Sequence, residues 1–393
     1  MTIFNMTNEY MNSSKSIFTA TEIHQQPEVY PKTIKLVKEM KNELEEFIGE
    51  ITNQEDFDII LAGAGTSEFV GNSLFSFLNN KYDNKVKSYA TTDIVATPKN
   101  YINATKPTIL VNYGRSGNSP ESVGSVSLAT KVNPNIKHLF ITCNKDGALS
   151  TYAKNHNNAL AINLPDETHD KSFAMTSSYT NMLLACLLSF NLDSLDKFEE
   201  QMQYIIKGAT KLVNEDFGFF KDLVDGYNFN RIVYLGANSL KGMAQESALK
   251  MLELTAGGCV TMFDTPLGFR HGPKSIINDE TLTVVYLSDN EYTQQYEADL
   301  IKEMSVQRKG NKILLISATE NPQLNELVDY NYCFNNEVKL DNVLLSLEYI
   351  IVAQLIALNN SLKADITPDN PCPTGEVNRV VQGVTIYENL EVA

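Results

Sequence analysis

The chain has 393 residues, which is enough for two domains of ordinary size. It carries 48 acidic and 32 basic residues, for a net charge of −16. This argues against a protein that binds nucleic acid or an anionic membrane, because both need a basic surface. The five cysteines are odd in number and include no Cys-x-x-Cys pair, so reduced thiols are expected rather than a disulfide framework or a zinc site.

The N-terminal residues show neither a charged region nor an apolar core of the kind found in signal peptides, so a cytoplasmic protein is expected. Helical apolar spacing over residues 31–50 predicts the first helix. Short apolar runs at 58–62, 108–112 and 138–142 predict strands that alternate with helices, the pattern of a parallel sheet. The longest apolar run, 343–358, contains polar residues and predicts a buried helix rather than a membrane span.

The three predicted strands recur in the second half of the chain in the same order. The matching segments are 59–64 with 232–237, 108–111 with 283–286, and 137–142 with 312–317. This repetition predicts two copies of one α/β domain. We expect an N-terminal helical extension (1–45), a first domain (46–200), a helical linker (201–220) and a second domain (221–393). Within the second domain, the tail 366–378 is rich in Pro and Asp or Asn and is expected to be a loop.

A glycine-rich turn, Gly63-Ala-Gly65-Thr66-Ser67, follows the first predicted strand and opens a helix. Glycine lets the backbone approach a ligand closely, and a helix N-terminus favours an anion such as phosphate. The third glycine that a dinucleotide fingerprint needs is replaced by Glu68, which disfavours a nicotinamide cofactor. An ordinary capped turn explains the same residues equally well.

A second polar segment, 112–121 (NYGRSGNSPE), follows the next predicted strand. A capped helix start explains Ser119 and the proline after it. It does not explain Arg115 and Ser116, which lie between two glycines. Clustered donors with an arginine suit an oxyanion, because a guanidinium binds phosphate through two hydrogen bonds. This loop is therefore predicted to bind phosphate.

A third segment, 170–180, is dense in hydroxyl groups and precedes a predicted helix at 181–190. Thr176 and Ser177 are candidate ligands, although a Ser/Thr-rich helix cap would have the same composition. His169 borders this segment and could line a site. For His24 the residues around it indicate no role.

A predicted helix over 241–254 places Glu246, Lys250 and Glu253 on one face. Such a face is commonly solvated. Here, however, the helix follows the glycine turn of the second repeat and precedes a Phe-Arg-His-Gly-Pro turn that contains His271. A carboxylate and a histidine are the groups needed for proton transfer on a sugar.

Taken together, GAGTS, GRSGNSPES, ESALKMLEL and FRHGP resemble the sugar isomerase (SIS) domain family over nearly the whole chain. TATEIHQQPEVY, CNKDGALS and NPCPTGEVNRVVQGVTIY resemble its tagatose-6-phosphate ketose/aldose isomerase and galactosamine-6-phosphate deaminase branch. The resemblance implies two tandem SIS domains, each a parallel sheet flanked by helices in three α/β/α layers. It also implies a phosphosugar ligand, bound by Ser67, Arg115, Ser116 and Ser119. From the loop patterns we add Gly65, Thr66, Thr176 and Ser177.

The resemblance further implies that Glu253 moves a proton between C1 and C2, with Lys250 in the same motif, and that His271 helps to open the sugar ring. In the related glucosamine-6-phosphate synthase module this histidine comes from the neighbouring subunit, so a homodimer or a dimer of dimers is expected. The imine-forming lysine of that module is replaced by Ser177, and its glutaminase domain has no counterpart here. Gly114 stands where a serine is common in the phosphate loop.

The expected reaction converts galactosamine 6-phosphate and water to tagatose 6-phosphate and ammonia, without metal or redox cofactor. One alternative is a plain ketose/aldose phosphate isomerase, which needs the same proton transfer but releases no nitrogen. Another is a phosphosugar-binding regulator, which the lack of a basic helix-turn-helix segment disfavours. The hypothesis of a nicotinamide dehydrogenase is supported by the GAG turn alone.

Overall fold

The computed structural model describes residues 2–307, 309–381 and 383–387. They form two compact units, each discontinuous in sequence. Unit 1 comprises 2–27, 171–176 and 200–373, and unit 2 comprises 28–170, 177–199 and 374–387.

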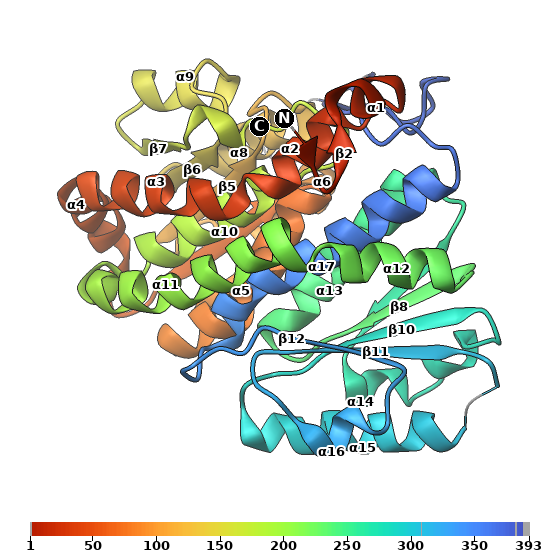
Figure 1. Ribbon diagram of the computed structural model, residues 1–393. Coiled ribbons are helices and arrows are strands. Elements are labelled where there is room, and N and C mark those ends of the chain that lie inside the picture. Colours follow the sequence, from red (N-terminus) through yellow and green to blue (C-terminus); the bar gives the residue numbers. More distant parts are fainter. Residues whose placement is uncertain (1, 308, 382, 388–393) are drawn as a thin grey trace. The chain divides into compact units, whose positions relative to one another are not determined.

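Unit 2 contains a parallel five-stranded sheet in the order β4-β3-β5-β6-β7. Three of its strands, β5, β6 and β7, are labelled in Figure 1. Its strands are β3 (Asp58–Gly63), β4 (Val86–Ala90), β5 (Thr108–Gly114), β6 (Lys137–Thr142) and β7 (Ala159–Asn163). Its helices are α3 (Gln26–Glu39), α4 (Lys41–Thr52), α5 (Thr66–Lys81), α6 (Thr91–Ala96), α7 (Pro98–Tyr101), α8 (Pro120–Val132), α9 (Ala148–Asn155) and α10 (Ser177–Ser189), with short turns at η1 (Asp166–Thr168) and η2 (Leu192–Ser194).

The two faces of this sheet are covered by different helices. Ile60 and Leu110 pack with Ile94 of α6 and Ala129 of α8 in one buried cluster. On the other face the Tyr113 hydroxyl donates to Cys186 Sγ of α10 at 3.0 Å. Successive residues of a strand point to opposite faces of the sheet, so an apolar strand can pack against helices on both sides. The sheet and the helices on its two faces form three layers.

Unit 1 repeats the plan with the order β12-β11-β10-β8-β9, again all parallel. Its strands are β8 (Arg231–Leu235), β9 (Val260–Asp264), β10 (Thr281–Tyr286), β11 (Lys312–Ser317) and β12 (Tyr330–Cys333). Its helices around the sheet are α12 (Gly218–Gly226), α13 (Ser239–Leu254), α14 (Pro266–Phe269), α15 (Glu291–Val306), α16 (Pro322–Asn325) and α17 (Asn342–Lys363), with a short turn at η4 (Pro273–Ile276). The N-terminal residues add the hairpin β1 (Thr2–Ile3) and β2 (Met6–Thr7), α1 (Asn8–Ser13) and α2 (Ile17–His24). The long helix α11 (Leu195–Lys211) continues into the π-helical turn η3 (Leu212–Asp216).

One face of this second sheet packs Val233 and Val285 against Leu300 of α15. The other face carries a stack of buried tyrosine rings, Tyr234, Tyr286 and Tyr349, with centroids 6.1 and 5.9 Å apart. Tyr349 lies on α17, so that helix is the core element of unit 1.

α17 is longer than the predicted apolar run. By length and composition it is the one helix among the described residues that could cross a membrane, but 94% of its most apolar stretch is buried inside the protein. The prediction of a buried helix is therefore confirmed.

The predicted fold class is confirmed: both halves are α/β units, and the recurring segments are β3 and β8, β5 and β10, β6 and β11. The sequence reading missed the edge strands β4, β7, β9 and β12, which are largely half-exposed. Of these, β4, β9 and β12 also lack a continuous apolar run. The helical structure predicted over 31–50 is present, but it is divided between two helices, α3 and α4, which are separated at Met40.

Candidate functional site

The first predicted phosphate loop joins β3 to α5. Gly65 adopts φ 56°, a conformation that favours glycine. A Cβ on Gly63 would lie 2.3 Å from the backbone carbon of Ser67, so the turn cannot form with a larger residue there. Thr66 and Ser67 are the first residues of α5 and are buried. The hydroxyl-bearing turn therefore sits at the N-terminus of a 16-residue helix, whose dipole favours an anion.

The second predicted loop joins β5 to α8. The carbonyl of Ser116 accepts a hydrogen bond from Asn144 Nδ2 at 2.9 Å, which ties the loop to the segment after β6. Ser119 is the N-cap of α8, but its hydroxyl donates to Ser122 Oγ at 2.7 Å instead of capping the backbone. Arg115 is only 6% exposed, and its Nη2 donates to the carbonyl of Arg379 at 2.8 Å.

These two loops come together because β3 and β5 are neighbours at the point where the strand order reverses. In a parallel α/β sheet the loops after such strands open a crevice, which is the usual ligand site. Sequence reasoning predicted each loop separately. The sheet order brings Gly65, Thr66 and Ser67 to the same edge as Arg115 and Ser116.

In the third predicted loop, several of the polar groups bind one another. Asp170 accepts hydrogen bonds from the backbone of Ser177 at 3.2 Å and of Ser178 at 2.9 Å, as well as from the Ser178 hydroxyl. Ser177 opens α10 and is fully buried, as is Thr176 of unit 1. Much of the hydroxyl density thus belongs to a helix start capped by an aspartate, and ligand roles for Thr176 and Ser177 stay a prediction.

One polar residue of unit 1 escaped the sequence reading. Glu22 on α2 is 5% exposed and accepts hydrogen bonds from the backbone of Lys171 and Ser172. It fixes the start of the third loop. Its only sequence signal is a charged residue among the apolar positions of a helix.

The predicted acid/base face on α13 is buried rather than solvated. Lys250 Nζ lies 3.1 Å from Glu246 Oε1 and 2.7 Å from Glu253 Oε2. The side chains of Lys250 and Glu246 are fully buried, whereas that of Glu253 is 22% exposed. Burial favours neutral Lys250, but the two carboxylates outweigh it and raise the pKa of the ammonium. Glu253 is therefore an accessible carboxylate backed by a fixed cation, which suits a general base.

His271 lies in the turn after α14 and is exposed. Its backbone N–H donates to the carbonyl of Gly268 at 3.0 Å, and Gly272 follows with φ 116°. The flanking cations Arg270 and Lys274 both pair with Glu303. The turn is thus fixed by ion pairs on either side of a solvent-accessible imidazole.

The histidines His138, His169 and His24 differ in their surroundings. His138 is buried, contacts the Thr130 hydroxyl at 2.9 Å, and has a pKa lowered to about 4 by burial, so it is a neutral core residue. Burial also lowers the pKa of His169, and the charges of Arg379 and Arg115 lower it further. The His24 ring contacts Asn214 Oδ1 at 3.1 Å and the edge of Phe4.

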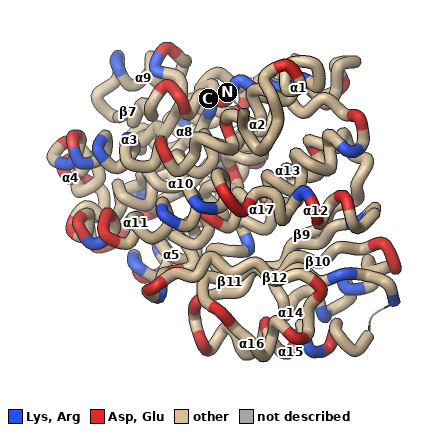
Figure 2. The backbone as a smooth tube through the Cα atoms, in the orientation of Figure 1, with Lys and Arg blue, Asp and Glu red and all other residues tan. Residues whose placement is uncertain are grey.

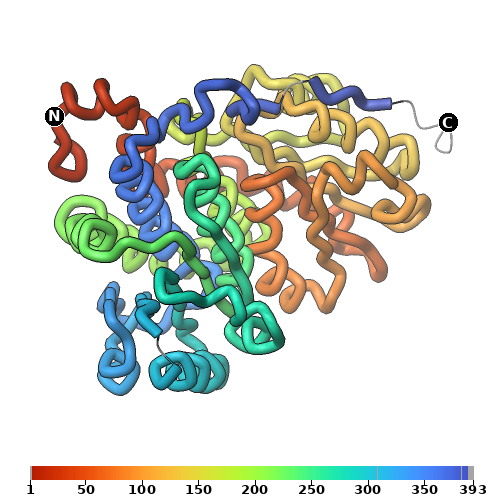
Figure 3. The backbone as a smooth tube through the Cα atoms, turned by 90° about the vertical axis from the view of Figure 1, so that its right-hand side faces the viewer, coloured from red at the N-terminus to blue at the C-terminus, as the bar shows by residue number. Residues whose placement is uncertain are grey.

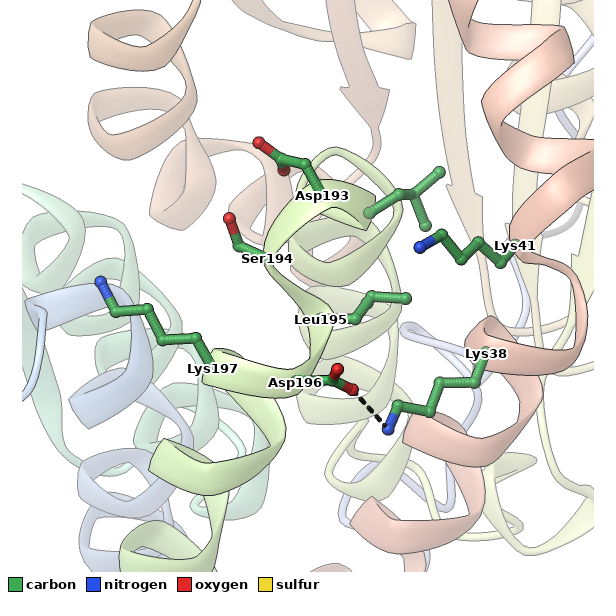
Figure 4. Close-up of a pocket in the computed structure, with 8 residues that line it drawn as sticks. Lys38, Lys41, Asp193, Ser194, Leu195, Asp196 and Lys197 are labelled. Carbon is green, nitrogen blue, oxygen red and sulfur yellow. Dashed lines mark hydrogen bonds and ion pairs between the residues drawn. The ribbon is translucent and has the colours of Figure 1, made fainter.

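A pocket of about 540 Å³ in unit 2 is lined by none of the predicted site residues (Figure 4). Three lysines line it, but Lys38 pairs with Asp196 at 3.2 Å and with Glu199, so its charge is balanced. No group of three or more His, Cys, Asp or Glu that could hold a metal ion occurs in the part of the chain that the structure describes.

The chain is similar to known proteins over most of its length. The SIS domain model matches residues 51–192 and 227–364. The chain is 38% identical over 382 residues to the D-galactosamine-6-phosphate deaminase AgaS of Escherichia coli, covering 94% of this chain and 95% of the relative. It is 39% identical to the same-named protein of Shewanella sp. strain ANA-3, covering 96% and 94%.

Two crystal structures are similar over nearly their whole length. The E. coli tagatose-6-phosphate ketose/aldose isomerase has a TM-score of 0.87 and 37% identity, covering 94% of this chain and 96% of that one. A protein of Clostridium novyi NT, provisionally named a tagatose-6-phosphate ketose/aldose isomerase, has a TM-score of 0.96 and 44% identity, covering 99% and 100%.

Proposed function

Since the chain belongs to the SIS domain family, we propose that it is an enzyme that converts galactosamine 6-phosphate and water to tagatose 6-phosphate and ammonia. The observation that carries this proposal is the buried Lys250 between two carboxylates, one of them accessible. A binding protein gains nothing from such a triad, since burying charges is costly. The curated relatives named as deaminases support the substrate.

The phosphate-binding role falls to the loops of unit 2, with Gly65, Thr66, Ser67, Arg115, Ser116 and Ser119 as its proposed ligands. Helix N-termini and a guanidinium hold phosphate through directed donors. The binding energy orients the sugar for reaction. We retain Thr176 and Ser177 as further proposed contacts.

Proton transfer falls to residues of unit 1. His271 moves a proton between O1 and O5, which opens the ring to the 2-amino aldehyde. Glu253 removes the C2 proton, leaving an enolamine, and returns a proton to C1, leaving an imine at C2. Water adds to C2, the C–N bond breaks, and ammonia leaves with the ketose phosphate. Lys250 stabilises the negative charge of Glu253 and the enolate-type charge that develops as the C2 proton leaves.

A plain ketose/aldose isomerase is the second candidate, because the similar E. coli structure carries that name. The two activities share the proton transfer and differ in nitrogen release. Incubation with galactosamine 6-phosphate, glucosamine 6-phosphate and galactose 6-phosphate, followed by assays of ammonia and ketose, separates them. Ketose from galactose 6-phosphate without ammonia from either amino sugar would favour the isomerase.

Replacing Glu253 by Gln removes the proposed base while keeping its shape. We expect turnover to fall at least about 100-fold, the usual contribution of general base catalysis, with phosphosugar affinity changed less than about threefold. Glu326→Gln, the same change at an exposed position of unit 1, serves as the control and should retain full activity. Ammonia release at the wild-type rate by E253Q would refute the assignment.

We also propose that the enzyme is a cytoplasmic homo-oligomer in which His271 acts on the substrate of a neighbouring subunit. The exposed imidazole in a rigid turn supports this, since it is available to a second chain. Mixing inactive E253Q with an inactive His271→Asn variant tests it. Recovery of about a quarter of the activity is expected for a shared site in a dimer, and none for a site within one chain.

A further inference from the structure

The carboxylate of Glu22 binds the backbone where the third loop begins. Glu22 lies on α2 and is 5% exposed. Its Oε1 accepts a hydrogen bond from the backbone N–H of Lys171 at 2.5 Å, and its Oε2 accepts one from that of Ser172 at 3.2 Å. A carboxylate has two acceptor oxygens and no donor, so it can accept from both adjacent N–H groups at once. All three residues belong to unit 1.

The segment 171–176 continues from this contact to Thr176. The Ser172 hydroxyl donates to the carbonyl of Ala174 at 2.8 Å, which closes a short turn. Ser172, Ala174 and Thr176 are fully buried, so most of the segment is closely packed. The position of its first two residues therefore constrains the position of Thr176 and of Ser177, the next residue along the chain.

The helix that carries Glu22 is itself held by a second carboxylate. Asp369 accepts hydrogen bonds from the backbone of Phe18 at 3.2 Å and of Thr19 at 2.8 Å, and from the Thr19 hydroxyl at 2.7 Å. It takes the role of an N-cap side chain, because Ser16 makes no side-chain capping bond to α2. In Figure 3 the red N-terminal segment lies beside the blue segment that follows α17. Glu22 thus projects from a helix with an anchored N-terminus.

The start of α10 indicates which part of a ligand the third loop can bind. The Asp170 carboxylate accepts from the backbone N–H groups of Ser177 and Ser178. A phosphate bound at a helix N-terminus uses such donors, and here they are already bonded. The hydroxyl groups of Thr176 and Ser177 can both donate and accept, as sugar hydroxyls do. The third loop therefore suits the sugar better than the phosphoryl group.

We infer that Glu22 is a positioning residue for the substrate, because it sets the course of segment 171–176 and so places the third loop for contact with the sugar. The inference rests on the proposed contacts of Thr176 and Ser177 and hence on the proposed function. The two backbone hydrogen bonds of Glu22 exist without a ligand, so the effect on the loop can be measured by itself.

The test uses Glu22→Gln in the full chain. An amide has one acceptor oxygen, and its NH₂ group would face a backbone N–H, so at least one of the two hydrogen bonds is lost. Hydrogen exchange followed by mass spectrometry should show the amides of 171–172 exchanging at least about tenfold faster than in wild type, as for a lost bond to a charged group.

Binding is measured by calorimetric titration of inorganic phosphate and of a sugar phosphate. The sugar phosphate is the one that wild type binds most tightly among galactosamine 6-phosphate, glucosamine 6-phosphate and galactose 6-phosphate. E22Q should bind it at least about threefold more weakly, as for one lost hydrogen bond. Its affinity for inorganic phosphate should equal that of wild type, because the proposed phosphate ligands lie on the other two loops.

Asp289→Asn is the matched control, because Asp289 also accepts a backbone N–H, that of Leu340 at 2.8 Å, but lies after β10. It should leave the exchange of 171–172 and both dissociation constants unchanged. Wild-type exchange of 171–172 in E22Q would overturn the inference, and so would a loss of sugar-phosphate affinity smaller than threefold. An equal loss for inorganic phosphate would also overturn it, since that indicates general damage rather than a displaced loop.

If circular dichroism shows that E22Q is unfolded, Glu22→Asp decides. Its carboxylate is on a side chain one carbon shorter and lies farther from both N–H groups, so exchange of 171–172 should be faster and the sugar phosphate should bind more weakly. Wild-type values for either would refute the role. The ammonia assay is read separately. A wild-type protein that binds a sugar phosphate more tightly than E22Q does, but releases no ammonia, refutes the proposed function alone.

Discussion

Buried carboxylates in unit 1 occur in two chemical situations. Glu246 has the Lys250 ammonium at 3.1 Å and shares it with Glu253, so a fixed cation stabilises its charge inside the core. Glu297 on α15 accepts hydrogen bonds from the backbone and hydroxyl of Ser288, both at 3.0 Å and both neutral. Burial therefore raises the pKa of Glu297 to about 7, and the hydrogen bonds offset only part of this rise.

This raised pKa has a consequence for stability. The carboxyl of the unfolded chain titrates near 4.5 and that of the folded protein near 7, so the folded state loses stability from this group as the pH rises from 4.5 through 7. Glu297→Gln resembles the protonated form and should be more stable than wild type at pH 8 by on the order of 1–3 kcal/mol, with little difference at pH 4.5.

Denaturant unfolding at several pH values measures this difference. The exposed Glu326→Gln should show none. A difference between E297Q and wild type that does not change with pH would contradict the predicted titration.

At the scale of elements, the turns that open α5 and α13 have the same backbone conformation. Gly65 has φ 56° and ψ −129°, and Asn238 has φ 54° and ψ −127°. Each follows a glycine whose added Cβ would clash with the next turn, at 2.3 Å for Gly63 and 2.5 Å for Gly236. The repeated Gly-Ala sequence thus specifies one local structure twice, although only the first copy carries the proposed phosphate ligands.

The turn before α13 has backbone strain that the turn before α5 lacks, because Asn238 has the conformation that glycine adopts freely. Asn238→Gly should therefore raise the free energy of unfolding by about 1 kcal/mol, the relieved strain less the added entropy of the unfolded chain. Gly65→Ala, where nothing lies within 4 Å of the new Cβ, should lower it by a similar amount. Urea unfolding of both variants tests the pair. A destabilised N238G would show that the asparagine side chain supports the turn.

At the scale of the whole molecule, the net charge of −16 is compatible with an anionic substrate. Figure 2 shows acidic and basic residues intermingled along α4 and α11, so many charges have opposite neighbours. Exposed charges are screened beyond about 10 Å at ordinary salt, whereas helix N-termini, hydroxyls and guanidinium groups act at contact distance. Local donors therefore determine whether phosphate binds.

The excess negative charge should still oppose folding at low ionic strength. We expect the melting temperature to rise by a few degrees when sodium chloride increases from about 0.01 M to about 0.2 M, because the Debye length falls from roughly 30 Å to below 10 Å. The buffer must contain no phosphate, because phosphate bound at the proposed site would stabilise the protein, and an equal osmolality of sucrose is the control. A fall in melting temperature would mean that surface ion pairs outweigh the net repulsion.

The sequence by itself determined the central strands, the paired α/β units and the glycine loops. These features are local: an apolar run such as 58–62 or a required glycine such as Gly63 leaves its signal in adjacent residues. The edge strands β4, β9 and β12 left no such signal, because half-exposed strands need no continuous apolar run.

Only the tertiary structure decided which charged groups are buried and which distant segments meet. The spacing of Glu246, Lys250 and Glu253 is the same on a solvated helix and on a buried one. The contact of Arg115 with Arg379 joins residues 264 positions apart. Burial and long-range pairing depend on how whole elements pack, and no single stretch of sequence contains that information.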